Sequence, residues 1–568
     1  MKRYSSHIII LTLLIAACSS ISSCKKNFAE INTDTRLVTS PNIKYLLTYS
    51  EDYYEKYQGT EWVWETMEQL FRFTQHATAQ PYEMTNNVNS RYSAFYANIL
   101  PNLLEIRRQV AGKSDSANYQ KAIAVTYVLQ VMQGLKVTDM NGSIAYSQAD
   151  LGRYDANFNP VYDAQDALFT NMLAQLNSAI SVLSNTTLAN QNSYGSSDVY
   201  YNSDWIKWAK LANTLKLRIA ARLDIANNAL AKTIFQQVLQ DPNGAITANA
   251  DQLSYKNIDY EPFGRGTGSS VNYRSTRFGT TSMVNFMKSV NDPRLAIYFE
   301  KNSLVGSYKD TLNKYSVTLP SFINPSDPLI QFQGGPADFT TNPTVAAYLT
   351  NTFPVGSNRY NLISPLNRNF FVPTYGIGGS TAGGFLDVIV TAAEGCFLTA
   401  EFIQKGYAGS VATNGTAEDW YKKGITSSIQ TMNNIAIAAP SPTGFTGDGS
   451  AEITAYLNNS GVKFNGTNNL ERIYIQEYLN YFRNGNEAFV FCRRTGYPKL
   501  TSTYYAREVF NEVIPRRFWT INPGQLNRDN WNAAMTAQGF TPNAQDLQTL
   551  STQRIWYDKT APDFGKGN

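Results

Sequence analysis

Apolar residues recur at helical spacing in six long segments, and this periodicity constrains the fold more than any other feature of the chain. In the first segment, Ile123, Tyr127, Val131 and Leu135 follow one another every four residues, which places them on one face of an α-helix. Similar stripes occupy residues 163–183, 205–223, 390–403, 416–432 and 470–482. Neighbouring helices of this length form the antiparallel pairs of tetratricopeptide arrays, although no clean repeat of about 34 residues is present. The sequence therefore predicts a mainly α fold with tetratricopeptide-like helix pairs.

Residues at the boundaries of these segments predict where the helices begin and end. Asp163 can cap the helix that follows it, because a side-chain oxygen accepts a hydrogen bond from a free N–H group of the first turn. The sequence Thr-Ala-Glu-Asp at residues 416–419 resembles a capping box. Gly406 follows the 390–403 segment at a position that commonly ends a helix. Strand-like pieces are short, and residues 315–319 are an example.

Long irregular segments rich in Gly, Asn, Ser and Tyr separate the helices, at residues 75–92, 254–282, 304–388 and 437–466. Loops of this length inside a compact domain are usually functional or disordered, and the aromatic residues in these segments favour order. The glycines between residues 376 and 384 do not form a phosphate-binding fingerprint, because Thr381 occupies the position of its third glycine. A mobile loop is the simpler interpretation.

Composition excludes several classes of function. Without Lys2 and Arg3, 46 Lys and Arg oppose 44 Asp and Glu, so no basic footprint for nucleic acid is indicated. His76 is the only histidine after residue 7, which excludes a multi-histidine zinc site and leaves one possible base for a catalytic triad. Paired carboxylates acting on glycosides need no histidine and stay possible. Beyond residue 24 only Cys396 and Cys492 occur, so at most one disulfide can form, and Cys396 is predicted to pack as a small apolar residue.

The N-terminal segment has the layout of a secretory signal. Lys2 and Arg3 precede a ten-residue apolar run at residues 8–17, which is too short to cross a bilayer. Small residues followed by cysteine then occur twice, before Cys18 and before Cys24, a pattern that resembles a bacterial lipobox. We predict a signal peptide at residues 1–23 and lipid attachment at Cys24, with Cys18 or an ordinary secreted protein as the alternatives. The rest of the chain also contains no apolar run long enough to span a membrane.

Eight motifs in the same order match one known family. The most specific are Gly485-Asn-Glu487 and Arg493-Arg-Thr-Gly-Tyr-Pro498, and the Trp205 helix contains Ala-Asn-Thr-Leu-Lys-Leu-Arg at residues 212–218. With these motifs the chain resembles the SusD/RagB family of outer-membrane nutrient-binding lipoproteins. Further matches lie at residues 24–34, 138–149, 159–163, 291–295, 393–401 and 514–517. The chain departs from the family pattern at Ala145, where proline is usual, and over residues 520–524.

The resemblance implies one SusD-like domain over residues 24–568, with a helical-repeat core and a loop-rich face for ligand. It implies a lipid-anchored protein at the cell surface that binds a glycan or oligopeptide. Such a protein delivers its nutrient to a SusC-like TonB-dependent outer-membrane transporter, as its lid, and needs no cofactor or metal. The transporter is expected on the helical-repeat face. Two other hypotheses stay open, namely an anchored glycoside hydrolase with paired carboxylates and an adaptor that binds only proteins.

No motif determines the ligand contacts, so we predict them from residue chemistry. Aromatic rings offer a flat apolar surface to a sugar, and Arg, Asn and His can orient its hydroxyl groups. The predicted contacts from two loops are His76, Tyr82 and Tyr92 from residues 75–92, and Tyr260, Phe263, Arg265, Tyr273 and Arg274 from residues 254–282. The motif residues Asn213, Lys216, Arg493 and Arg494 are instead expected to be structural. The two arginines are expected to pair with Glu477 or Glu487.

Overall fold

The computed structural model describes residues 41–54, 60–78, 84, 86–188, 190–257, 277–367, 385–437, 444–445 and 447–567. The predicted signal peptide and Cys24 therefore lie outside the described residues. Within the described residues, no helix combines the length and the apolar character that a membrane crossing requires.

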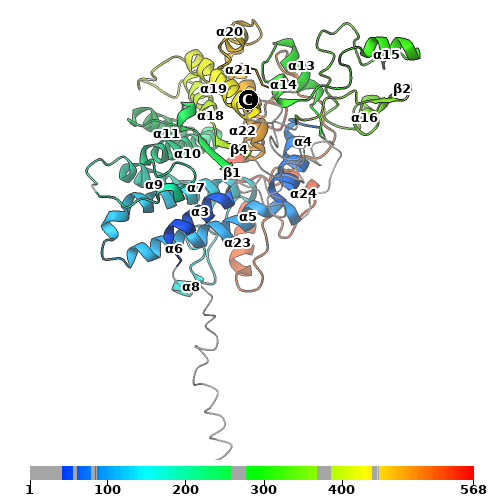
Figure 1. Cartoon of the computed structure of the whole chain (residues 1–568). Coiled ribbons are helices and arrows are strands. Elements are labelled where there is room, and N and C mark those ends of the chain that lie inside the picture. Colours follow the sequence, from blue (N-terminus) through cyan, green and yellow to red (C-terminus); the bar gives the residue numbers. More distant parts are fainter. Residues whose placement is uncertain are drawn as a thin grey trace, which may run out of the picture.

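The first half of the chain forms a layer of helices packed against one another. Figure 1 shows α6, α7 and α9 at the lower left, beside α10 and α11. Helix α7 packs on α9, and α10 packs on both α9 and α11, as the predicted helix pairs require. The helices of this half are α3 (Ile43–Tyr54), α4 (Phe71–Thr74), α5 (Ser90–Ala94), α6 (Leu100–Ala111), α7 (Gln120–Asn141), α8 (Gly152–Asp155), α9 (Gln165–Leu183), α10 (Trp205–Ala226) and α11 (Asn228–Gln240).

The second half continues the helical layer and adds an irregular lobe. Helix α18 packs on α19 and α21, at the upper left of Figure 1, whereas α15 and α16 lie at the upper right. The helices of this half are α13 (Thr281–Ser289), α14 (Leu295–Tyr298), α15 (Tyr308–Tyr315), α16 (Pro343–Thr350), α18 (Ala392–Gln404), α19 (Ala417–Ile437), α20 (Ser450–Asn458), α21 (Asn469–Asn480), α22 (Gly485–Thr495), α23 (Arg528–Gln538) and α24 (Leu547–Thr552).

Two short antiparallel sheets complete the described fold. Strand β1 (Leu253–Asn257) pairs with β4 (Phe385–Val390), and Asn257 stands opposite Phe385. Strand β2 (Phe353–Val355) pairs with β3 (Asn358–Tyr360). The mainly α class is as predicted, but the segments predicted to be irregular also contain short helices, with α15 and α16 inside residues 304–388 and α20 inside residues 437–466. The strand predicted at residues 315–319 is wrong, because α15 includes Tyr315 and Ser316 then ends it in the left-handed conformation.

Two predicted helix starts are also wrong. Asp163 does not cap α9, because its carboxylate accepts the backbone N–H groups of Tyr146 and Ser147, each at 2.9 Å. Val390 ends β4, and Thr391 caps α18 by accepting the N–H of Glu394 at 3.1 Å.

The predicted capping box is confirmed. The Thr416 hydroxyl accepts the N–H of Asp419 at 3.2 Å, and the Asp419 carboxylate accepts the N–H of Thr416 at 2.9 Å. The two bonds satisfy donors at the start of α19 that would otherwise have no partner.

Five buried charged residues join helices that are distant in the chain. On α10, Arg222 donates to Asp139 of α7 and to Glu487 of α22, in both cases at 2.8 Å. One turn earlier, Arg218 forms a two-pronged pair with Glu394 of α18 at 2.6 and 2.8 Å. We call Asp139, Arg218, Arg222, Glu394 and Glu487 the α10 charge cluster. Its members are all buried, so each charge depends on its partners for stabilisation.

The predicted pairing of the later arginines is correct only in part. Arg494 donates to both oxygens of Glu401 at 2.8 Å and lies 3.3 Å from Glu477. Arg493 donates to the backbone carbonyl of Arg516 at 2.8 Å. Glu487 pairs with the arginines of α10 instead, because α22 presents it to that helix.

Replacing Arg222 with Met should lower the free energy of unfolding by about 3–5 kcal/mol, because Asp139 and Glu487 would stay buried without their shared cation. Urea denaturation of the purified protein measures the change. The control is Lys422→Met, which removes an exposed pair with Glu418 at 2.7 Å and should cost about 0.5 kcal/mol or less. Equal effects of the two substitutions would refute the structural role of the α10 charge cluster.

Candidate ligand-binding site

The two loops predicted to bind ligand leave the fold at adjacent points. Thr78 and Phe278 exchange two backbone hydrogen bonds, of 2.8 and 3.2 Å. Thr78 directly precedes residues 79–83, and Phe278 lies just after residues 258–276. Residues 79–83 and 258–276 are outside the described residues. The structure therefore brings together the ends of two loops that lie about 200 residues apart in the chain.

A third segment, residues 368–384, begins and ends beside the two ends of residues 258–276. The N–H of Leu366 donates to the carbonyl of Arg277 at 3.0 Å, and in the β1–β4 ladder Asn257 is the partner of Phe385. Residues 258–276 and 368–384 are thus adjacent at both ends. We call Thr78, Arg277, Phe278 and Leu366 the loop base. The prediction from sequence did not include this third segment, although its aromatic residues, Phe370, Phe371 and Tyr375, were a usable signal.

Glu508 connects segments of the chain that lie around the loop base. Its carboxylate accepts the backbone N–H groups of Ser282 at 3.0 Å and Ala337 at 2.9 Å. Its own backbone exchanges two hydrogen bonds with the Gln75 side chain, at 2.9 and 3.0 Å. Burial raises the pKa of Glu508 above its usual value, and the two N–H donors oppose this rise. Glu508 thus links three segments around the loop base, two through its carboxylate and the third through its backbone.

Close backbone contact beside the loop base requires glycine at residue 334. A Cβ atom there would lie 2.5 Å from the Cα of Thr281 and 2.6 Å from the carbonyl oxygen of Thr280. These neighbours are backbone atoms at the start of α13, which cannot move aside as a flexible side chain can.

Arg277 of the loop base and three charged residues near it form two ion pairs. Arg277 forms an ion pair with Glu68, and Arg72 forms one with Glu512. Burial lowers the pKa of Arg72 to about 10, so its guanidinium stays charged at neutral pH. Of these four side chains only Glu512 is substantially accessible, with 21% of its side chain exposed.

His76 does not face a ligand, and its predicted role is contradicted. The side chain is fully buried, with Nδ1 2.8 Å from the Thr74 hydroxyl and Nε2 2.8 Å from the carbonyl oxygen of Tyr478. Its ring centroid lies 4.1 Å from that of Tyr478. Burial lowers the pKa of His76 to about 4, so the imidazole is neutral near pH 7. His76 is part of the core below the loop base.

Tyr92 lies on a helix and not on a loop, because residues 86–94 are helical. The ring is half-buried and its centroid is 4.6 Å from that of Tyr96. The other six predicted contacts lie outside the described residues, and their roles stay predictions: Tyr82, Tyr260, Phe263, Arg265, Tyr273 and Arg274.

Comparison with known proteins identifies the family. A family described as starch-binding and associating with the outer membrane, SusD-like, matches residues 26–519. The protein therefore belongs to the SusD-like family, whose members associate with the outer membrane. No protein with a curated function matches the sequence.

Solved structures show the same fold over almost the whole chain. A chitin-binding protein superposes with a TM-score of 0.68 at 22% identity, covering 91% of this chain and 100% of its own. A chitin-binding SusD homologue from Flavobacterium johnsoniae gives 0.63 at 21% identity, covering 92% and 100%. A SusD homologue from Bacteroides fragilis gives 0.65 at 18% identity, with the same coverage. At these identities the likeness establishes the SusD-like fold, as the motifs predicted.

The burial of His76 predicts a pH-dependent contribution to stability. The pKa falls from 6.5 in the unfolded chain to about 4 in the folded one, so the unfolded chain binds the proton more readily between these values. The contribution of neutral His76 is complete above pH 6.5 and is lost as the pH falls towards 4, by up to roughly 3 kcal/mol.

Urea denaturation at several pH values, for the wild type and His76→Gln, isolates this contribution from that of other groups. The wild type should lose stability more steeply than the variant between pH 6.5 and 4. Parallel curves would show that His76 does not titrate as a buried base.

Proposed function

We propose that this protein is a lipid-anchored, cell-surface glycan-binding protein that delivers its ligand to a TonB-dependent outer-membrane transporter of the SusC type, acting as its lid. Membership of the SusD-like family supports the binding of a glycan and association with the outer membrane. Two structural neighbours are described as chitin-binding, which favours a glycan over an oligopeptide as the nutrient.

The observation that carries this proposal is the meeting of three segments at the loop base. By sequence, these segments contain many aromatic residues: Tyr82, Tyr260, Phe263, Tyr273, Phe370, Phe371 and Tyr375. Rings supply the flat apolar surface on which a sugar can stack, and Arg265 and Arg274 supply donors for its hydroxyl groups. We infer that the ligand binds above the loop base.

The proposed function is binding and delivery without catalysis. Glu394, Glu401 and Glu487 are buried and each pairs with arginine, so these carboxylates serve the fold. The transporter is proposed to contact the helical-repeat face, which leaves the loop base for the nutrient.

The proposed anchor is compatible with this arrangement. Pro41, the first described residue, lies seventeen residues after Cys24, and an extended chain of that length reaches at most roughly 60 Å.

Replacing Tyr82 and Tyr273 together with Ala should weaken the binding of the cognate oligosaccharide by roughly tenfold or more, because each lost stacking ring costs about 1 kcal/mol. Calorimetry with chito-oligosaccharides and malto-oligosaccharides provides the affinities. The control removes two exposed rings elsewhere, Tyr45 and Tyr315, of which 71% and 39% are exposed. Unchanged affinity in a folded Tyr82→Ala, Tyr273→Ala variant would place the ligand on other residues.

Replacing Cys24 with Ala should release the protein from the membrane fraction, because no acyl chain could then be attached. Stable anchoring needs more than one membrane signal, at about 0.8 kcal/mol per buried CH₂. Fractionation of cells and intact-mass measurement of the extracted protein test this, with Cys18→Ala as the matched control. A mature chain that begins at Cys18, or a Cys24→Ala variant that stays in the membrane, would disprove the assignment.

A further inference from the structure

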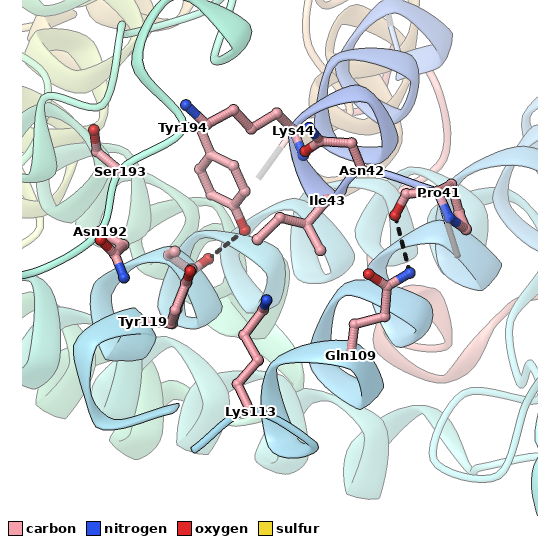
Figure 2. A pocket seen from close by; sticks show the side chains of 11 residues that line it. Pro41, Asn42, Ile43, Lys44, Gln109, Lys113, Tyr119, Asn192, Ser193 and Tyr194 are labelled. Carbon is pink, nitrogen blue, oxygen red and sulfur yellow. Dashed lines mark hydrogen bonds between the residues drawn. The ribbon is translucent and has the colours of Figure 1, made fainter. Parts of the chain in front are cut away.

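A pocket of about 430 Å³ lies among helices far from the loop base. It opens between the N-terminal end of α3, the C-terminal end of α6 and the start of α7 (Figure 2). Its size falls within the range of small-molecule sites. The lining residues are Pro41, Asn42, Ile43, Lys44, Gln109, Lys113, Tyr119, Ala122, Asn192, Ser193 and Tyr194. Figure 1 shows α6 at the lower left and α13, which follows the loop base, at the upper right.

The charge of the pocket is positive. Lys44 and Lys113 line it, and no Asp or Glu does. Both lysines are exposed. Lys113 reaches into the space between Tyr119, Ile43 and Gln109 in Figure 2, and its ammonium is 5.5 Å from the centre of the Tyr119 ring. In the part of the chain that is described, neither ammonium has a carboxylate within 4.0 Å. An anionic ligand would supply the missing partner.

The uncharged groups of the pocket suit a sugar. Two walls are fixed by internal hydrogen bonds, because the Tyr194 hydroxyl donates to the carbonyl of Ala122 and the Gln109 side chain donates to that of Pro41, each at 3.0 Å. The side chains of Tyr119, Asn192 and Ser193 form no hydrogen bond with any described residue. They leave hydroxyl and amide groups for a ligand beside two aromatic rings.

We propose that this pocket is a second binding site, for a sugar unit that carries a carboxylate or a phosphate. The ammonium groups would bind the anion, and the free hydroxyl and amide groups would bind the sugar. Such a unit could come from a soluble acidic saccharide or from the sugar phosphate of a membrane lipid. A membrane lipid is within reach of the pocket, since Pro41 lines it and an extended chain from the proposed anchor at Cys24 to Pro41 spans at most roughly 60 Å. This site is independent of the glycan proposed for the loop base.

Titration with glucuronate, glucose 1-phosphate and glucose, followed by ligand-observed NMR, tests the first source. The two anionic sugars should bind at least tenfold more tightly than glucose. Lys44→Met with Lys113→Met should abolish this preference, and Tyr119→Ala, which removes a ring that lines the pocket, should weaken all binding. The matched control is Lys309→Met with Lys314→Met, which removes the same charge from two exposed lysines that also lie near tyrosine rings, at 6.0 and 5.3 Å.

Co-sedimentation with phosphatidylcholine vesicles, with or without lipid A, tests the second source in a Cys24→Ala background that carries no acyl chain. Binding only to lipid A vesicles, lost in the Lys44, Lys113 variant, would assign the pocket to a membrane lipid. Binding of the soluble sugars alone would assign it to a saccharide. The proposal is overturned if neither probe binds, if glucose binds equally well, or if the control variant loses as much binding as the Lys44, Lys113 variant. Circular dichroism confirms that each variant is folded.

Discussion

Arg218 and Arg222 hold together helices that lie hundreds of residues apart in the chain. Their partners are Asp139 on α7, Glu394 on α18 and Glu487 on α22. Taking such charges out of water is costly, and the cost is recovered only where the partners meet in good geometry. Apolar contacts alone would allow the helices to slide or rotate at small cost, whereas a two-pronged arginine pair has one satisfactory arrangement. The α10 charge cluster therefore sets how the two halves of the helical layer meet.

The position of the candidate ligand site depends on the same interaction. Glu394 lies in the first turn of α18, four residues after the end of β4. By pairing with Arg218 it holds β4 against the helical layer, and β4 in turn pairs with β1. Residues 258–276 and 368–384 extend from the ends of these two strands. A charge pair buried in the helices thus determines where two of the three loop segments leave the fold, and Glu508 gives the loop base its second support.

The sequence predicted the parts of the fold that depend on local physics. Helical periodicity located α7, α9 and α10, and the capping box at residues 416–419 was correct because both of its partners lie within one turn. The errors arose where distant contacts decide the structure. Asp163 turns from its own helix to Tyr146 and Ser147. His76 follows α4 in a segment that was predicted to be a loop. It is buried because it packs against Tyr478, which lies 402 residues away in the chain. Nor could the sequence show that residues 368–384 share the loop base, since this follows from strand pairing.

The difference between buried charged residues and exposed loop residues explains why the sequence reveals the family but not the nutrient. Asp139, Arg218, Glu394 and Glu487 belong to the motifs that matched the family, and all of them lie in the α10 charge cluster. Losing any one of them would leave a buried charge without its partner, so such residues are hard to replace while the fold is kept. Exposed loop positions rarely affect stability by more than a few tenths of a kcal/mol. Exposed positions can therefore change with the ligand without loss of the fold, and residues proposed to contact the ligand need follow no common pattern. Recognition of the ligand can vary because the fold is determined elsewhere.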